Sequence, residues 1–386
     1  MKKFLAILMA AVMVAAMFAG CGGKTSYTAN NTEYVIGVSG PLTGAAAIYG
    51  TAVKNSAEMA VEEINAAGGL NGIKFRLEAM DDKHDPTNIS TNYASLLNKG
   101  MQLSLGTVTT DPGKEFKNLS VEDNVFFLTP SASGDEIPAN PNGYQMCFAD
   151  GNQGKVAAKF VSENFAGQTI GVFFKSDDSY SKGIYDQFTA NLDKSVTVVE
   201  TSFTKANETD FSTQIDTLKN CKFIFMPIYY TPASIFMTQA KSILAADAVY
   251  YGCDGFDGID SADGFDITAI PQKVTMLSHF NSKAEDGAAK TFIDKYVAKY
   301  GKETLNQFGA SAYDCIYALY GAMKKAIDNG TEIPVTISAS DLCEILKKEF
   351  AGGYTYENGV TGDKITWEAS GYVNKDAIQY VIKDAG

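Results

Sequence analysis

The chain has few of the residues and motifs on which most enzymes depend. Only 2 of its 386 residues are histidine. The nucleophile-elbow pattern G-x-S-x-G is absent, and so is the phosphate-binding pattern G-x-x-x-x-G-K-[ST]. No block of lysine and arginine occurs, and the net charge of −13 argues against a nucleic-acid partner. We therefore expect a protein that is not an enzyme, uses no cofactor and binds no nucleic acid.

Paired cysteines and metal-ligand spacings are also lacking. Besides Cys21, the chain has an odd set of cysteines with no C-x-x-C pair: Cys147, Cys221, Cys253, Cys315 and Cys343. Four of these lie in apolar or aromatic contexts, which favours buried free thiols over a disulfide framework. The segment "DDKHD" at 81–85 could hold a metal ion, but Pro86 closes it and we interpret it as a solvated turn. We expect no metal site.

The N-terminus has the pattern of an export signal. Two lysines precede the apolar run 4–19, which is short for a membrane span of about 20 residues. The segment "FAGC" resembles a bacterial lipobox, in which the cysteine becomes the lipidated first residue. We interpret 1–20 as a lipoprotein signal peptide, Cys21 as the lipidation site and 21–33 as a flexible tether. The alternative is an ordinary cleaved signal. The sequence therefore predicts an extracytoplasmic protein that is lipid-anchored to the cell membrane.

Apolar strand-like runs alternate with helix-like runs over most of the remaining chain. The first series has strands at 34–40, 73–80, 101–106 and 125–129 and helices at 48–67, 87–99 and 113–123. The second has helices at 152–165, 180–193, 210–219 and 232–245 and strands at 169–174, 196–203, 222–228, 249–252 and 274–280. Continuous apolar runs are typical of parallel strands that are covered on both faces. The pattern predicts an α/β fold with two doubly wound parallel-sheet lobes.

The last part of the chain is mainly helical. Helical patterns at about 285–300, 306–328 and 340–349 precede two late strands, "DKITW" and "AIQYVI". A helical tail after a finished α/β series suggests that the chain returns to its first lobe. We expect an N-terminal lobe of 34–149 plus about 281–370 and a C-terminal lobe of 150–280 plus about 371–386.

Ligands in such sheets bind at the carboxyl ends of the strands, so the loops there are the candidates. These loops are rich in hydroxyl groups and tyrosines: "SGPLTG", "GTVTTDPG", "TPSASG", "FKSDDSYSKG", "PIYYTP" and "GCDGF". The lone carboxylate of Asp254 could be a metal ligand, a catalytic acid, the counter-ion of a bound cation or a solvated loop residue. Two hydroxyl-rich loops facing one acidic loop fit a zwitterion, with its carboxylate on one side and its ammonium on the other.

Four ordered motifs carry a family resemblance. The segments "GPLTG", "YG", "EEINAAGGLNG" and "DDKHDP" between residues 40 and 86 resemble the opening of the leucine/isoleucine/valine-binding protein family. These proteins are the solute receptors of branched-chain amino acid ABC transporters. The resemblance implies a type 1 periplasmic-binding fold, with two lobes joined by three crossing segments and closing over the ligand by a hinge motion.

The resemblance also implies a set of ligand-binding residues: Tyr49, Thr110, Ser131, Ala132, Ser133, Asp150, Tyr180, Tyr230 and Asp254. By position in the family, Thr110 and Ser133 hold the ligand carboxylate, and Asp254 takes the place of an acidic residue that holds the ammonium. Ser131 and Ala132 face the ammonium or the ligand backbone. The tyrosines surround the ligand, and Asp150 lies near it at the first crossing.

Two departures from the family affect the ligand. Asp254 is one methylene shorter than the glutamate often found there, so the ammonium must lie closer or a water must intervene. Asp111 lies beside the carboxylate loop, where it either repels a carboxylate or caps the following helix, and we favour the cap. The many tyrosines suit either a larger side chain or the core.

The sequence as a whole predicts a monomeric receptor that delivers an amino acid, branched-chain or otherwise apolar, to an ABC permease in the membrane. Two alternatives remain open at this point. One is a ligand-binding sensor that reports to a membrane receptor. The other is a receptor for an amide or an aromatic acid without an ammonium group, against which the carboxylate of Asp254 argues.

Overall fold

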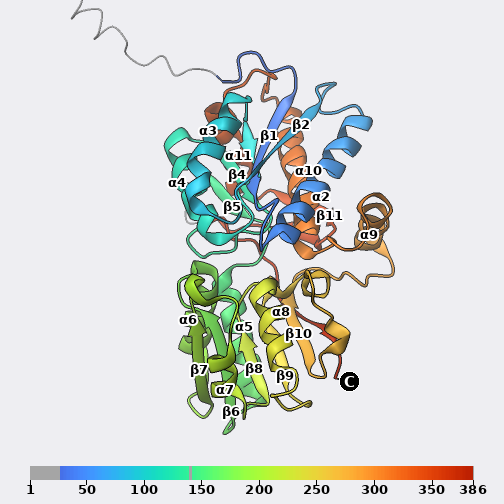
Figure 1. Ribbon diagram of the computed structural model, residues 1–386. Helices are drawn as coiled ribbons and strands as arrows, with labels where there is room; N and C mark the ends of the chain where they lie inside the picture. Colours follow the sequence, from blue (N-terminus) through green and yellow to red (C-terminus); the bar gives the residue numbers. More distant parts are fainter. Residues whose placement is uncertain (1–26, 139–140, 386) are drawn as a thin grey trace, which may run out of the picture.

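The computed structural model describes residues 27–138 and 141–385, and these form two lobes joined at a narrow junction (Figure 1). The first lobe contains a parallel sheet in the order β2-β1-β3-β4-β5. Its strands are β1 (Tyr34–Gly40), β2 (Phe75–Asp81), β3 (Leu103–Ser104), β4 (Phe126–Thr129) and β5 (Gly143–Gln145). Its helices are α2 (Ala47–Ala66), α3 (Ile89–Asn98), α4 (Thr110–Asp123), α9 (Gly287–Tyr300), α10 (Gln307–Asp328) and α11 (Ala339–Ala351).

The second lobe contains a sheet in the order β13-β10-β9-β8-β6-β7. Its strands are β6 (Thr169–Lys175), β7 (Thr197–Phe203), β8 (Phe223–Met226), β9 (Val249–Gly252), β10 (Lys273–Ser278) and β13 (Ile378–Lys383). Only β13 pairs antiparallel, with β10. The helices are α5 (Asp150–Asn164), α6 (Ser179–Asn191), α7 (Ser212–Leu218) and α8 (Tyr230–Ala240). These two sheets have the α/β architecture that the sequence predicts.

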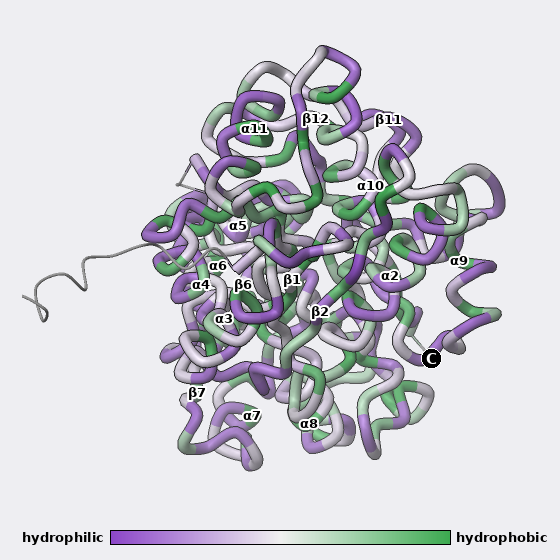
Figure 2. The backbone as a smooth tube through the Cα atoms, turned by 90° about the horizontal axis from the view of Figure 1, so that it is seen from above, coloured by the Kyte–Doolittle hydropathy of each residue, from purple (hydrophilic) through white to green (hydrophobic). Residues whose placement is uncertain are grey.

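The central strands are buried as their composition requires. Every residue of β1 and of β8 is buried, because helices cover both faces of each sheet. Viewed from above, hydrophobic segments lie mainly toward the interior and hydrophilic segments toward the periphery, for example in α9 (Figure 2). The five cysteines in the described part of the chain are buried free thiols.

The late helices return to the first lobe. The chain crosses between the lobes after β5, after β10 and again before β13. After the second crossing, α9 lies against α2, where Lys295 forms an ion pair with Glu63 at 3.0 Å. The side chain of Asn306 then caps α10 by accepting hydrogen bonds from the amides of Phe308 and Gly309. This return places the start of α10 beside the junction between the lobes.

Two strands have no counterpart in the sequence pattern. β5 has 3 residues, too few to show an alternation. β11 (Thr355–Gly359) is half-exposed and polar, and it forms a separate hairpin with β12 (Gly362–Thr366). One strand is shorter than the sequence predicts: the apolar run 101–106 forms only the two-residue β3, which lies between β1 and β4.

Candidate ligand-binding cleft

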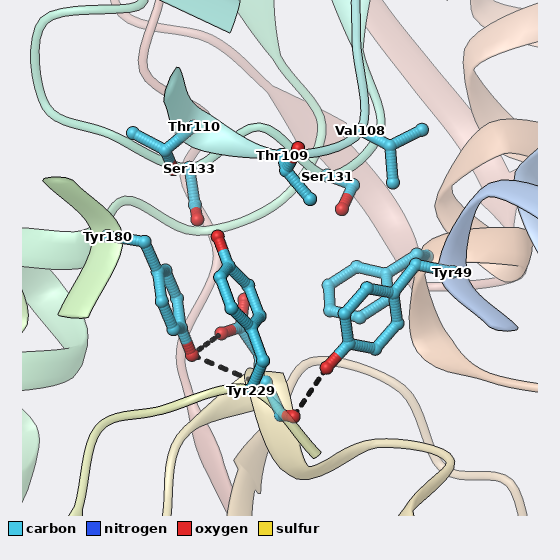
Figure 3. Close-up of a pocket in the computed structure, with 11 residues that line it drawn as sticks. Tyr49, Val108, Thr109, Thr110, Ser131, Ser133, Tyr180 and Tyr229 are labelled. Atoms are coloured by element: carbon cyan, nitrogen blue, oxygen red, sulfur yellow. Dashed lines mark hydrogen bonds between the residues drawn. The ribbon is translucent and has the colours of Figure 1, made fainter. Parts of the chain in front are cut away.

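The strand ends of both lobes converge on a compact cavity at the junction (Figure 3). Its walls come from loops after β3 and β4, from α2 and α10, and from the second-lobe segments that follow β6, β8 and β9. The lining residues are Tyr49, Val108, Thr109, Thr110, Ser131, Ser133, Tyr180, Tyr229, Asp254, Gly255 and Phe308. Only about 10 Å³ remains between them, roughly the room that one water needs. The lobes are therefore closed on one another, and their own side chains fill the cavity.

The first-lobe wall is a group of buried hydroxyls. Thr110 begins α4, and Ser131 and Ser133 lie in the loop after β4. The Thr129 hydroxyl accepts a hydrogen bond from the Ala132 amide at 3.0 Å, which fixes that loop close to the strand end. Hydroxyl donors beside the N-terminus of a long helix are suited to a carboxylate, because free amides and the helix dipole favour negative charge there.

The second-lobe wall carries a single carboxylate, that of Asp254. This residue follows β9 and is 1% exposed. Its Oδ1 accepts a hydrogen bond from the Tyr180 hydroxyl at 2.7 Å, and its backbone amide donates to Gln153 Oε1 at 3.0 Å. Its Oδ2 has no hydrogen-bond partner among the described residues. A buried carboxylate oxygen that lines a cavity and has no hydrogen-bond partner is suited to bind a cation.

Burial determines the protonation of this carboxyl. Loss of solvation raises the pKa of Asp254 to about 6, against the opposing effect of the hydrogen bond from the Tyr180 hydroxyl. At neutral pH most of the group is therefore ionised. The hydroxyls of the first lobe and the anion of the second lobe face each other across the cavity, which gives the site two chemically opposite ends.

Three tyrosines form the remaining wall and connect the lobes. The rings of Tyr180 and Tyr229 are stacked, with centroids 4.6 Å apart, and Figure 3 shows the hydroxyl of Tyr229 pointing toward Ser133 of the first lobe. Tyr49 donates a hydrogen bond from its hydroxyl to the carbonyl of Gly255 at 2.5 Å and accepts one from the amide of Tyr230 at 3.3 Å. Since Tyr49 belongs to the first lobe and both partners to the second, this hydroxyl holds the lobes together.

The structure brings together most, but not all, of the residues that the sequence suggests for the site. Six of them line the cavity: Tyr49, Thr110, Ser131, Ser133, Tyr180 and Asp254. The other three lie outside its lining: Ala132, Asp150 and Tyr230. Ala132 is fully buried behind its loop, and its carbonyl accepts a hydrogen bond from Gln145. Cys21, the suggested lipidation site, lies outside the described residues.

The second tyrosine position differs from the sequence interpretation by one residue. Tyr230 is the first residue of α8 and lies outside the cavity, while the preceding Tyr229 lines it. Tyr229 has extended backbone and Tyr230 is helical, so their side chains leave in different directions. The adjacent "YY" gives no signal that separates them. Phe308 was also missed, because only the return of the late helices brings α10 to the cavity.

A second, larger cavity of about 550 Å³ adjoins the compact one. Tyr229 lines both. Charged residues of the two lobes surround the larger space, among them Lys83, Asp85, Asp111, Lys175, Asp178 and Glu208. Asp111 thus lies in the first turn of α4 and faces this chamber, not the hydroxyl cluster.

His84 stands between the two cavities without a charge. Its Nδ1 is 2.9 Å from the Thr109 hydroxyl, and its ring packs edge-on against Tyr229. Burial and the nearby Lys175 lower its pKa to about 4, so the imidazole is neutral at pH 7. In the described part of the chain, no group of three or more His, Cys, Asp or Glu side chains is arranged to hold a metal ion.

Comparison of the sequence with known protein families identifies the family of this chain. The family model for periplasmic binding proteins matches residues 33–376. The chain belongs to the periplasmic binding protein family. Members of this family are extracytoplasmic solute-binding proteins and not enzymes, which agrees with the sequence interpretation.

Individual relatives support the finer resemblance. The Leu/Ile/Val-binding protein BraC3 of Rhizobium johnstonii is 27% identical over 331 residues, which cover 80% of this chain and 86% of that protein. LivJ of Streptococcus pneumoniae, a branched-chain amino acid transporter substrate-binding protein solved with isoleucine, has a TM-score of 0.73 at 24% identity and covers 90% of this chain and 100% of its own. The resemblance to Leu/Ile/Val-binding proteins and the type 1 periplasmic-binding fold are thereby confirmed.

A further structural neighbour carries a different ligand. A solute-binding protein of an ABC transporter from R. palustris, solved with benzoate, has a TM-score of 0.76 at 16% identity and covers 92% of this chain and 94% of its own. The fold of this periplasmic binding protein therefore occurs with ligands that lack an ammonium group. No helix within residues 27–138 or 141–385 is long and apolar enough to cross a membrane.

Proposed function

We propose that this periplasmic binding protein captures a free α-amino acid between its lobes and delivers it to an ABC permease. The observation that carries the proposal is the unpartnered Oδ2 of Asp254, which is buried and lines the cavity opposite the first-lobe hydroxyls. An ammonium bound there completes the hydrogen bonding of the carboxylate. The carboxylate of the same ligand then accepts hydrogen bonds from Thr110 and Ser133.

Closure of the lobes strengthens both interactions. Water is excluded when the cleft closes, so each ligand charge interacts with its partner in a medium of lower dielectric constant. The bridge from Tyr49 to Gly255 and Tyr230 stabilises that closed state. The permease then recognises the closed form.

The rest of the ligand lies against an apolar and aromatic wall. Val108, Phe308 and the tyrosine rings favour an apolar side chain, in agreement with the names of the Leu/Ile/Val-binding relatives. Because the compact cavity has no room for a side chain, Tyr229 must turn toward the adjoining chamber when the ligand binds. Lipidation of Cys21 keeps the receptor close to its permease at the membrane surface.

An aromatic acid is the second candidate ligand, and the neighbour solved with benzoate is the observation that favours it. Such a ligand satisfies the hydroxyl wall but leaves the Asp254 anion buried without a partner. That cost disfavours an acid without an ammonium group.

A thermal-shift screen tests the proposal directly. The protein without its first 26 residues is melted with each of the standard amino acids and with benzoate. A ligand at a hundred times its dissociation constant stabilises the folded state by about 2.7 kcal/mol. We expect branched-chain amino acids to raise the melting temperature and benzoate to leave it unchanged. Stabilisation by benzoate and by no amino acid contradicts the proposal.

A further inference from the structure

A second carboxylate lies behind Asp254, and like Asp254 it is incompletely hydrogen-bonded. Asp150 begins α5 at the first crossing between the lobes and is 2% exposed. Its Oδ2 has no hydrogen-bond partner among the described residues, as is true of Asp254 Oδ2. The side chain of Gln153 joins the two: its Nε2 donates to Asp150 Oδ1 at 3.4 Å, and its Oε1 accepts from the Asp254 amide at 3.0 Å.

The ionisable groups that act on this pair are acidic or neutral. Around Asp254 they are Tyr49 of α2, Tyr180 of α6, the thiols of Cys147 and Cys253, and Asp257. Around Asp150 they are the carboxyls of Asp135, Asp178 and Asp254, the hydroxyls of Tyr180 and Tyr229, and the thiols of Cys147 and Cys253. Asp257 already accepts a hydrogen bond from the Gln307 amide at 2.8 Å. None of these groups is a cation that could balance two buried negative charges.

Lys375, a half-buried lysine of this region, is engaged elsewhere. Lys375 of the third crossing donates to the Met146 carbonyl at 2.7 Å and to the Thr361 hydroxyl at 2.5 Å. The charge that acts on it most strongly is that of Asp314. Lys375 therefore does not neutralise Asp150 or Asp254.

Two negative charges linked through one glutamine side chain in a buried site are costly to hold together, so one carboxyl holds a proton. Asp254 is the better anion, because the Tyr180 hydroxyl donates a hydrogen bond to its Oδ1. Asp150 is the better acid to remain neutral, since burial and then the charge of Asp254 raise its pKa well above the ordinary value. Hydrogen bonding to the Ser133 hydroxyl opposes that shift only in part.

We propose that Asp150 holds a proton in the ligand-free closed form and releases it when the ligand ammonium arrives, so that amino acid capture is linked to proton release. The proposal rests on the proposed function, because the ammonium is the charge that replaces the proton. The O–H bond of Asp150 breaks, the proton passes to the solvent, and the ammonium then balances the paired carboxylates. Ser133 links this event to the other end of the site, since it contacts Asp150 and belongs to the hydroxyl wall.

Titration calorimetry in two buffers tests the proposal. Leucine is the first probe, at pH 7 in phosphate and in Tris, whose ionisation enthalpies differ. We expect the observed binding enthalpy of the natural protein to differ between the buffers by up to the equivalent of one proton released per ligand. In Asp150→Asn we expect leucine to bind with the same enthalpy in both buffers, because the amide has no proton to release.

The matched control is Asp82→Asn in the first lobe. Asp82 is also buried, and desolvation likewise raises its pKa to about 6. Its side chain contacts Ser39 and the amide of His84, away from the carboxylate pair. This variant should release as many protons as the natural protein does.

A measurement on the natural protein keeps the proposal open to refutation if a variant fails to fold. The dissociation constant for leucine should fall as the pH rises from 5.5 to 7.5, by up to about tenfold per pH unit. Equal enthalpies in both buffers, or the same proton release in Asp150→Asn, would overturn proton-linked capture while leaving amino acid binding intact. Absence of binding by every amino acid would overturn the proposed function and this proposal with it.

Discussion

Asp254→Asn changes one oxygen of the site into an amide nitrogen and should have opposite effects on binding and on stability. A bound ammonium left without an anionic partner in the closed cleft costs about 3–5 kcal/mol. At about 1.4 kcal/mol per decade, this weakens amino acid binding on the order of a hundred- to several-thousand-fold. Titration calorimetry with the amino acid that gives the largest thermal shift measures this loss.

The ligand-free protein should become more stable at the same time. Burial raises the pKa of Asp254 from 3.8 to about 6, so the folded state disfavours the ionised form. This destabilisation is absent below pH 3.8 and fully developed above about pH 6. At ~1.4 kcal/mol per pKa unit, it amounts to roughly 3 kcal/mol at neutral pH, and the variant is relieved of it.

Two controls make this prediction sharp. Asp260→Asn removes an exposed carboxylate six positions later, for which we expect no change in binding or stability. Ligand-free melting curves of both variants at pH 5 and pH 7.5 show whether the gain grows with pH, as the direction of the pKa shift requires. Binding of Asp254→Asn within tenfold of the natural protein would refute the assignment of the ammonium site.

Three further changes test other parts of the structure. Tyr229→Ala joins the compact cavity to the chamber of about 550 Å³, so we expect larger amino acids to gain affinity relative to valine in competition calorimetry. Lys375→Met removes the positive charge that acts on the buried Asp314 carboxylate, and we expect a loss of about 3–5 kcal/mol of folding free energy in chemical denaturation. Cys21→Ala should move the protein from the membrane to the soluble fraction, and continued membrane attachment would contradict the lipid anchor.

The repeated parts of the fold could be predicted because their signal is local. The run 34–40 and the helical pattern 48–67 correspond closely to β1 and α2, since burial on both faces requires unbroken apolar sequence. β5 could not be found in this way, because its place depends on pairing with β4 and it has too few residues for a pattern.

The residues of the site likewise fall into those with a local sequence signal and those placed only by the tertiary fold. Residues in the loops after recognisable strand-like runs, such as Thr110 after 101–106 and Asp254 after 249–252, could be predicted to lie at the sheet edge. Phe308 could not, since the chain must cross the junction twice before α10 reaches the cavity. The choice between Tyr229 and Tyr230 depends on where α8 begins, and a helix start shifted by one residue redirects both side chains.

The two buried carboxylates give the closed cleft a specific dependence on its ligand. Without an ammonium, closure encloses the Asp254 anion without a counter-ion, which disfavours the closed state. The interlobe hydrogen bonds of Tyr49 favour closure without a ligand. A ligand with an ammonium removes the electrostatic cost, while an acid such as benzoate does not. Closure therefore reports on the charge of the ligand, and the permease receives a closed form whose population depends on a captured amino acid.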